Sequence, residues 1–249
     1  MTGVRRPGAV CRFALALMLL CCAAPGRLAA ATVPEFEAEY LIKRAGLTLG
    51  RTRLSFHHTA DGRYAYESTS TVSGLLSWLR EEHVSESSSG SMDSNAIQPD
   101  EYRFQRTGDR GRRDATVSFD WNNGTAVNTV DGSTWKMDIR PGTLDKLVVQ
   151  IAIMQHLQAG VANLEFSVAD GGKPKRYSIV IHGEETVEVP AGEFAAVRIE
   201  QRAENTNRKT FLWAAPALDY LPVKIVREEN SGATYYSVLE SVTINGKER

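Results

Sequence analysis

The stretch EFEAEYLIK, residues 35–43, alternates apolar and charged side chains over most of its length. Its apolar positions are Phe36, Ala38, Tyr40 and Ile42. Because successive side chains of a strand point to opposite faces of a sheet, this period of two predicts a β-strand with one buried face. A second strand-like run covers residues 47–56, and the alternation resumes at Tyr64 after the turn signal Asp61-Gly62.

Turn signals recur at short intervals further along the chain. They are Gly90, Gly108, Asn123-Gly124, Asp131-Gly132 and Gly171-Gly172. Short strand-like runs lie between them, whereas parallel βαβ units would need a helix between successive strands. The chain is therefore predicted to be mainly β, with a curved antiparallel sheet or a partly open β-barrel or sandwich.

One segment departs from this pattern and predicts a single buried helix near residues 144–159. Its apolar positions follow helical spacing and also occupy the remaining faces: Leu144, Leu147, Val148, Val149, Ile151, Ala152, Ile153 and Met154. A helix that is apolar nearly all round is buried on most sides. Thr143 is expected to cap its start, Asp145 to lie in its first turn, and Gly160 to end it.

The first 31 residues are predicted to be a cleaved signal peptide. Arginines at positions 5, 6 and 12 precede an apolar run at residues 13–24, which is shorter than the roughly 20 residues of a membrane-spanning helix. The alanines at positions 29–31 are the small residues that a signal peptidase requires at its cleavage site. We therefore expect residues 32–249 to form one β-rich periplasmic domain, with no transmembrane segment after cleavage. A lipoprotein signal fits less well, because Leu20 rather than a small residue precedes Cys21.

The composition of the chain argues against several kinds of site and partner. All three cysteines lie within the predicted signal peptide, so residues 32–249 hold no disulfide and no thiolate metal site. The first 31 residues carry four arginines and no acid, which leaves 25 basic and 30 acidic residues. Such a balance argues against a nucleic-acid partner, whose binding needs a basic surface.

Four stretches, in this order, resemble a known family. They are residues 74–76 with 85–90, 97–99 and Tyr102; residues 143–147; residues 188–194; and FLWAAP at 211–216 with LDYLPVKI at 218–225. Together they resemble the exported bacterial family called domain of unknown function 3108. The resemblance implies a periplasmic β-rich domain without an established activity, and it supplies no catalytic residues.

The sequence assigns no catalytic residue, metal site or cofactor. The five histidines include the adjacent pair His57 and His58, whose side chains would point to opposite faces of a strand, and none of the five shows a recognised ligand spacing. There is no GxSxG nucleophile motif, and the glycine pairs lie in hairpins rather than before helices.

Two groups of residues are candidates for binding. The first is the apolar segment Leu75, Leu76, Trp78 and Leu79, which would form the lip of a hollow in the sheet. The second is Trp213 and Tyr220, although filling the core is the simpler interpretation of these two.

The leading hypothesis is a non-enzymatic domain that binds an apolar or lipidic ligand, or an envelope protein, in a concavity of the sheet. The alternative is a hydrolase that acts on an envelope polymer or lipid through Asp, Glu or His residues gathered by the fold. A structural partner within an assembly is a third interpretation, for which a large flat apolar patch would be the sign.

Overall fold

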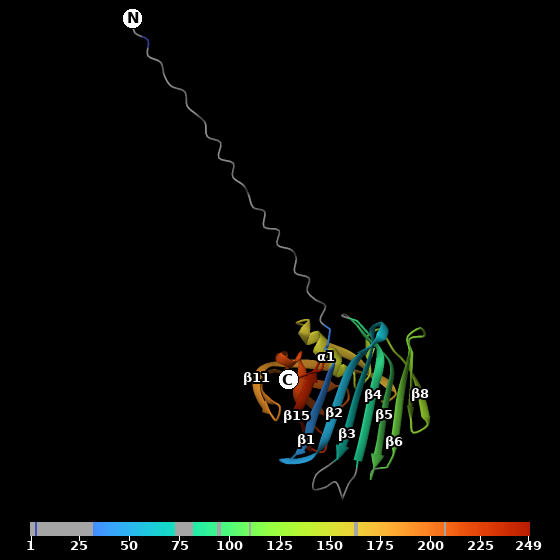
Figure 1. The fold of residues 1–249 in the computed structure, drawn as a ribbon. Coiled ribbons are helices and arrows are strands. Elements are labelled where there is room, and N and C mark those ends of the chain that lie inside the picture. Colours follow the sequence, from blue (N-terminus) through green and yellow to red (C-terminus); the bar gives the residue numbers. More distant parts are fainter. Residues whose placement is uncertain are drawn as a thin grey trace. The chain divides into compact units, whose positions relative to one another are not determined.

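The computed structural model describes residue 3 and residues 32–72, 82–93, 96–109, 111–161, 164–206 and 208–249. Contacts divide the chain into two units, Met1–Ala30 and Ala31–Arg249. The second unit, which contains all the strands and the helix of the described residues, is treated below (Figure 1).

The described residues of this unit form sixteen strands, one α-helix and two short 3-10 helices. In chain order they are β1 (Phe36–Arg44), β2 (Leu47–Thr59), η1 (Ala60–Gly62), β3 (Arg63–Val72), β4 (Glu82–Met92), β5 (Ile97–Gly108), β6 (Arg113–Asp120), β7 (Thr125–Val130), β8 (Ser133–Asp138), β9 (Thr143–Leu144), α1 (Val149–Gln158), β10 (Leu164–Asp170), β11 (Lys173–Val189), β12 (Gly192–Ala203), β13 (Lys209–Ala215), η2 (Pro216–Leu218), β14 (Leu221–Glu228), β15 (Thr234–Ile244) and β16 (Lys247–Glu248).

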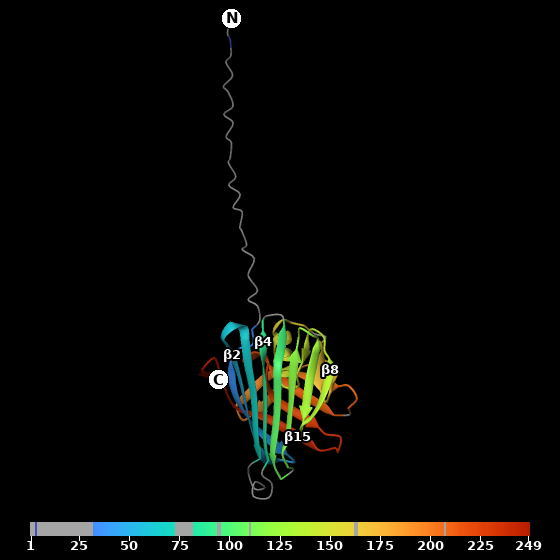
Figure 2. The same cartoon turned by 90° about the vertical axis from the view of Figure 1, so that its right-hand side faces the viewer.

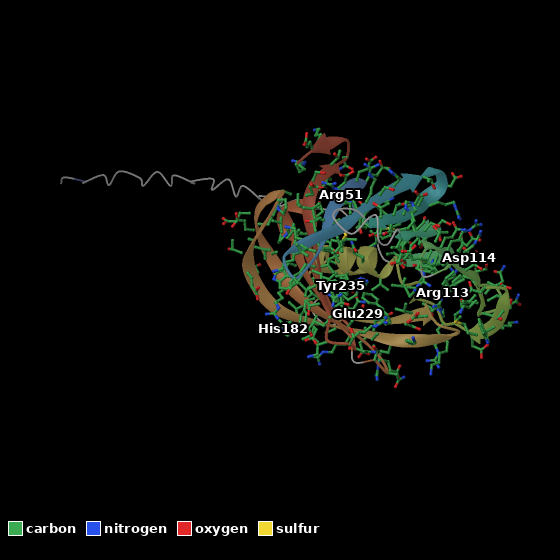
Figure 3. All side chains as sticks on the ribbon, turned by 90° about the horizontal axis from the view of Figure 1, so that it is seen from below. Arg51, Arg113, Asp114, His182, Glu229 and Tyr235 are labelled. Carbon is green, nitrogen blue, oxygen red and sulfur yellow. The ribbon has the colours of Figure 1, made fainter. Side chains whose placement is uncertain are left out.

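All sixteen strands belong to one sheet, built from two antiparallel meanders. Strands β1 to β8 pair in chain order, as do β10 to β15, and β1 pairs with β15 to join the two meanders. The pairing of β9 with β10 is parallel. The sheet bends strongly, and in the view from below it curves around α1 (Figures 1, 2 and 3). This confirms the predicted mainly-β fold with a curved antiparallel sheet.

The first predicted strand is observed as β1, with its apolar positions facing the core. Phe36, Ala38 and Tyr40 are almost completely buried, whereas Glu37 is exposed. The ring of Phe36 packs on that of Phe56, with 5.8 Å between the centroids. The burial of one face of the strand thus follows from the period of two in its sequence.

The helix is shorter than predicted, since α1 begins at Val149 rather than near residue 144. Thr143 and Leu144 instead form β9, whose pairing with β10 extends the sheet edge. Thr143 does not cap the helix, because its hydroxyl accepts a hydrogen bond from the Arg140 amide. The helical periodicity of residues 144–148 reflects burial against the same core, which a short strand and a turn satisfy equally well.

Asp145 lies before the helix and organises the turn that leads into it. One carboxylate oxygen accepts the backbone N–H groups of Leu147 and Val148, at 2.8 and 2.9 Å. This local bonding of an aspartate to nearby amides favours a turn over a helical turn. The expected placement of Asp145 in the first helical turn was therefore wrong.

The predicted end of the helix and its burial are confirmed. Gly160 has a φ of 70°, and its amide donates to the Leu157 carbonyl while that of Val161 donates to the His156 carbonyl. This is the left-handed glycine ending common at helix C-termini. Seven of the ten helical residues are buried: Val149, Ile151, Ala152, Ile153, Met154, Gln155 and Leu157.

Candidate ligand-binding hollow

The curve of the sheet encloses a hollow of about 1210 Å³. Its walls come from β1 to β4 of the first meander, from β12 to β15 of the second, and from the start of α1. Figure 3 labels two of its lining residues, Tyr235 and Glu229, in the view from below. Most lining residues alternate along their strands, as Leu54 and Thr52 do on β2, because alternate side chains face the same side of a sheet.

One part of the lining is apolar and mostly buried. It is made of Tyr40, Leu54, Tyr66, Leu147, Val149, Leu212 and Ile225. Each of these packs in or against the main core cluster. This part of the hollow is therefore a continuation of the core, and it offers a water-poor surface to any ligand that reaches it.

A second part of the lining is uncharged and polar. It includes the hydroxyls of Thr52 and Ser70, which hydrogen-bond to each other at 2.8 Å, together with Ser68 and Thr210. These residues lie on the same strands as the apolar lining, two or four positions away. The polarity of the wall thus changes along the strands.

The outer end of the hollow is charged. It is lined by the β1–β2 and β14–β15 hairpins, where Leu47 is 57% exposed. Arg208 forms an ion pair with Glu229 at 2.9 Å. The Arg44 guanidinium lies 5.3 Å from the centroid of the Tyr235 ring. The exposed side chain of Arg227 has neither an ion pair nor a hydrogen bond with any residue that the structure describes.

Two buried donors in the lining have no hydrogen-bond partner among the described residues, namely the Tyr66 hydroxyl and the Gln150 side-chain nitrogen. The other fully buried tyrosines differ in this respect. Tyr40 donates to the Pro222 carbonyl at 2.8 Å, and Tyr102 donates to Glu86 at 2.8 Å. Burial raises the pKa of Tyr66 well above its ordinary value, so its hydroxyl keeps its proton and remains a donor.

Beside this wall, but outside the lining of the hollow, lies a buried chain of polar groups. The Ser88 hydroxyl donates to Asp145 at 2.5 Å and lies 3.0 Å from the Tyr64 hydroxyl. Burial raises the pKa of Asp145 to about 6, against the opposing effect of its hydrogen bonds from Ser88 and the backbone. All three side chains are almost inaccessible to solvent, so this chain is a structural link between β3, β4 and the turn before α1.

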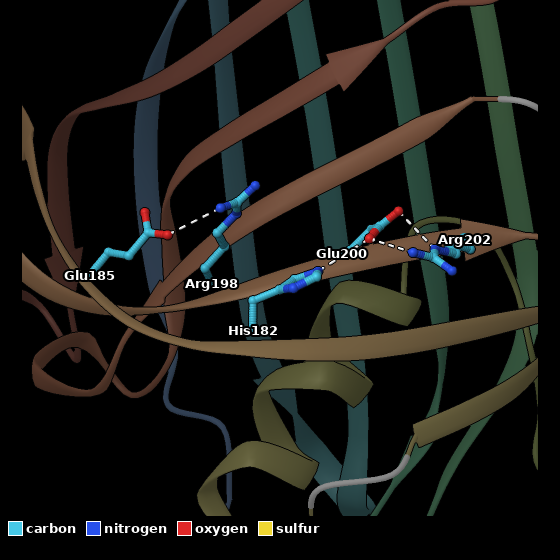
Figure 4. Close-up of polar contacts among 5 residues, drawn as sticks. All are labelled: His182, Glu185, Arg198, Glu200 and Arg202. Carbon is cyan, nitrogen blue, oxygen red and sulfur yellow. Dashed lines mark hydrogen bonds and ion pairs between the residues drawn. The ribbon is translucent and has the colours of Figure 1, made fainter.

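A histidine–carboxylate pair exists in the structure, outside the lining of the hollow (Figure 4). His182 lies 3.2 Å from Glu200, and Arg202 donates two hydrogen bonds to the same carboxylate at 2.7 and 2.8 Å. The Arg202 hydrogen bonds, aided by His182, lower the pKa of Glu200 to about 2. A carboxylate held ionised in this way acts as an ion-pair partner rather than as a general base.

Trp213 and Tyr220 do not line the hollow. Trp213 is 7% exposed, and its indole nitrogen donates to Glu185 at 2.9 Å while the Lys224 ammonium lies 4.5 Å from its ring. Tyr220 follows η2 in a left-handed conformation and packs against the core. A binding role for these two stays a prediction, as it does for Leu75, Leu76, Trp78 and Leu79, which lie outside the described residues.

Neither a metal cluster nor a spanning helix is found in the part of the chain that the structure describes. No three His, Cys, Asp or Glu side chains there are placed to hold an ion, and no helix there has the length and apolar character to cross a bilayer.

The comparisons with known proteins cover most of this unit. The profile of the family described as Protein of unknown function (DUF3108) matches residues 36–238. The chain belongs to this family. All the residues that line the hollow lie inside the matched range, so the hollow is built from the DUF3108 domain itself. The predicted resemblance is confirmed.

One solved structure supports the fold of this DUF3108 domain, and two others superpose on it more loosely. A β-barrel-like protein of the domain of unknown function DUF1849 from Brucella abortus superposes with a TM-score of 0.58 at 10% identity, over 86% of this chain and 98% of that one. A candidate lipoprotein from Parabacteroides distasonis gives 0.37 at 10% identity, over 86% and 96%. A candidate exported protein with a YmcC-like fold from Bacteroides fragilis gives 0.28 at 11% identity, over 85% and 97%.

The first of these structures supports the fold alone, and the other two superpose too loosely to support any argument. No curated protein matches the chain.

Proposed function

We propose that this DUF3108 protein binds an amphipathic lipid in the hollow, with the apolar part of the lipid against the buried lining and its polar head at the outer end. We further propose, from the signal sequence, that it does so outside the cytoplasm. The observation that carries the proposal is a single hollow whose lining changes from apolar core residues to charged hairpin residues.

The size of the hollow favours a large ligand. Pockets for drug-sized molecules measure about 300–1,000 Å³, and the hollow measures about 1210 Å³. Its lining includes Leu54 and Leu212, which belong to the continuous apolar core, and Ile225, which packs against that core. An extended apolar body is the kind of ligand that gains most from such a wall, because the gain grows with the apolar area removed from water.

The charged end suits a polar head. Arg44, Arg208 and Arg227 line it together with Glu229, which neutralises Arg208. Two cationic side chains are then left without a carboxylate partner among the described residues. An anionic or zwitterionic head would find at least one unneutralised guanidinium there.

The carboxylates of the hollow do not favour the hydrolase alternative. Glu82 and Glu86 line the hollow from the same strand, β4. Their Cα atoms lie about 13 Å apart along the strand, and a further lining carboxylate, Glu229, forms an ion pair with Arg208. Glu86 is also engaged by the Tyr102 hydroxyl at 2.8 Å.

The proposal is tested by filling the hollow from within. Ser68 lines it from β3, while the neighbouring Thr69 is exposed on the opposite face of the same strand. We expect Ser68→Trp to abolish uptake of a pyrene-labelled phosphatidylglycerol, and Thr69→Trp to leave uptake unchanged. Fluorescence titration measures both, and thermal unfolding checks that both variants fold. Equal binding by the two folded variants would show that the lipid does not enter the hollow.

A further inference from the structure

We propose that a second pocket binds an acidic sugar, with the indole of Trp135 against one face of the sugar ring and with Arg113 and Lys173 on its carboxylate or phosphate. The pocket measures about 320 Å³ and shares no lining residue with the hollow. The inference therefore goes beyond lipid binding and does not depend on it.

The pocket lies where the two ends of the sheet approach each other. Strand β8 is at one end of the strand order, and β10 and β11 lie close to the other end. β8 and β11 are in contact although they are not neighbours in the sheet. The lining includes Arg113, Asn128 and Trp135 from β6 to β8, and Gly171, Gly172 and Lys173 from the β10–β11 hairpin. A ligand in the pocket thus contacts both ends of the sheet.

Two cationic residues of the pocket are accessible and not neutralised. Arg113, labelled in Figure 3, and Lys173 are exposed, and neither side chain forms an ion pair or hydrogen bond with a residue that the structure describes. Among the described residues, no carboxylate lines the pocket. The neighbouring Asp114 and Asp170 already form ion pairs with other basic side chains, at 2.6 and 2.8 Å. The pocket therefore favours an anionic group, since a guanidinium binds carboxylate and phosphate oxygens with charge-assisted hydrogen bonds.

Trp135 supplies an apolar wall that the fold leaves uncovered. It lies on β8 and is 48% exposed, whereas Trp213 is 7% exposed. A Cβ added at Gly172 would lie 3.9 Å from the Trp135 side chain, so glycine brings the turn against the indole without a side chain that crowds it. Exposed tryptophan offers a flat, amphipathic surface for ligands.

A buried amide holds this arrangement in place before any ligand binds. Asn128 is 4% exposed. In the orientation that satisfies both ends of its amide, it donates to the Thr116 carbonyl and accepts from the Gly172 amide, each at 3.1 Å. These bonds tie β6, β7 and the β10–β11 turn together, and such preorganisation lowers the cost of binding.

The character of the walls favours a sugar over a flat aromatic acid. Trp135 provides one apolar face, and the rest of the pocket includes two cationic side chains and the backbone of Gly171 and Gly172. The ring of a sugar has CH groups that pack on an indole and hydroxyls at its edge that bond to polar groups. The second face of an aromatic acid would instead lie against polar groups and gain little.

The test compares sugars that differ in one charged group. The probes are glucose, glucuronate, glucose 6-phosphate and inorganic phosphate, titrated into the full-chain protein by saturation-transfer NMR. We expect at least one of the two acidic sugars to bind about tenfold or more tightly than glucose and inorganic phosphate, the usual effect of a hydrogen bond to a charged group. Arg113→Gln and Lys173→Gln should each remove most of this preference, and Trp135→Leu should weaken the binding of every sugar.

Lys136→Gln is the matched control. Lys136 is exposed next to Trp135 on β8 but does not line the pocket, so its loss removes the same charge and should leave binding within about twofold. Ser68→Trp, which fills the hollow, should also leave sugar binding unchanged. Thermal unfolding checks that every variant folds.

The possible results separate this inference from the proposed function. Equal binding of glucose and both acidic sugars, or no binding of either acidic sugar, would overturn it and leave lipid binding intact. Inorganic phosphate that binds as tightly as glucose 6-phosphate would show an adventitious ion only. Wild-type binding by folded Trp135→Leu would also overturn it.

Discussion

Replacing Asp145 with asparagine tests the electrostatics of the buried turn that holds α1 against the sheet. Burial raises the pKa of Asp145 from 3.8 to about 6 in the folded protein. The asparagine oxygen can still accept the amides of Leu147 and Val148, and its nitrogen can donate to Ser88, whose hydroxyl then donates to Tyr64. The hydrogen bonds of the turn are therefore kept in the Asn variant, and only the ionisable group at position 145 is lost.

The sign of the effect follows from the direction of the shift. Between pH 4 and 6 the folded protein keeps the Asp145 proton and the unfolded chain loses it, so wild-type stability falls as the pH rises and levels off above pH 6. A shift of about two pKa units corresponds to about 3 kcal/mol. Asp145→Asn should therefore match the wild type near pH 4 and exceed it by about 3 kcal/mol at pH 7.

Urea denaturation of both proteins between pH 4 and 8 measures this difference in stability. The contributions of the other titrating groups are the same in both proteins and cancel in the difference. Asp120→Asn is a control of opposite sign, because hydrogen bonds from Asn123 lower the pKa of the exposed Asp120. A stability difference between Asp145→Asn and the wild type that is the same at every pH would refute the reasoning.

Two further substitutions test the packing of the sheet. Gly90→Ala places a Cβ against the Gln98 carbonyl oxygen, closer than atoms can approach, across the β4–β5 bulge. It should lower the free energy of unfolding, measured in urea, by about 1–3 kcal/mol. An unfolding midpoint equal to that of the wild type would show that the bulge can relax. Tyr40→Phe removes the hydrogen bond to the buried Pro222 carbonyl and should lower the free energy of unfolding, measured by calorimetry, by about 0.5–1.5 kcal/mol. Tyr66→Phe should not lower it, because the Tyr66 hydroxyl has no partner among the described residues. Equal losses would contradict the assignment of Tyr66 as an unused donor.

The strand pattern was predictable because it depends on local chemistry. The alternation from Phe36 to Ile42 and the glycine turns follow from backbone geometry that each short segment carries in itself. The pairing of β1 with β15, which joins the two meanders, brings together residues about two hundred positions apart and has no signature in either strand. The curve that encloses the hollow depends on that pairing.

The helix start was mispredicted because a buried helix and a short strand followed by a turn, both packed on the core, need the same apolar residues at Leu144, Leu147 and Val148. Asp145 decides between them by bonding to the next amides, and the sequence shows only that an acid is present.

The sequence predicts the kind of site, a concavity in a curved sheet, but not the residues that distinguish it. A concavity in a curved sheet follows from the fold, but Tyr66 looks like any other residue of an alternating strand. Its distinguishing feature is a missing partner, which depends on strands and a helix from distant parts of the sequence. Trp213, by contrast, is conspicuous in the sequence as the tryptophan of the FLWAAP stretch. Its contacts with Glu185 and Lys224 explain its burial without a ligand.

Native mass spectrometry of the protein purified from the cell envelope, followed by extraction of whatever stays bound, tests lipid binding in the hollow most directly. We predict a retained lipid in the wild type and in Thr69→Trp, and none in Ser68→Trp. A wild type that carries no lipid and takes none up from phosphatidylglycerol vesicles would contradict the account.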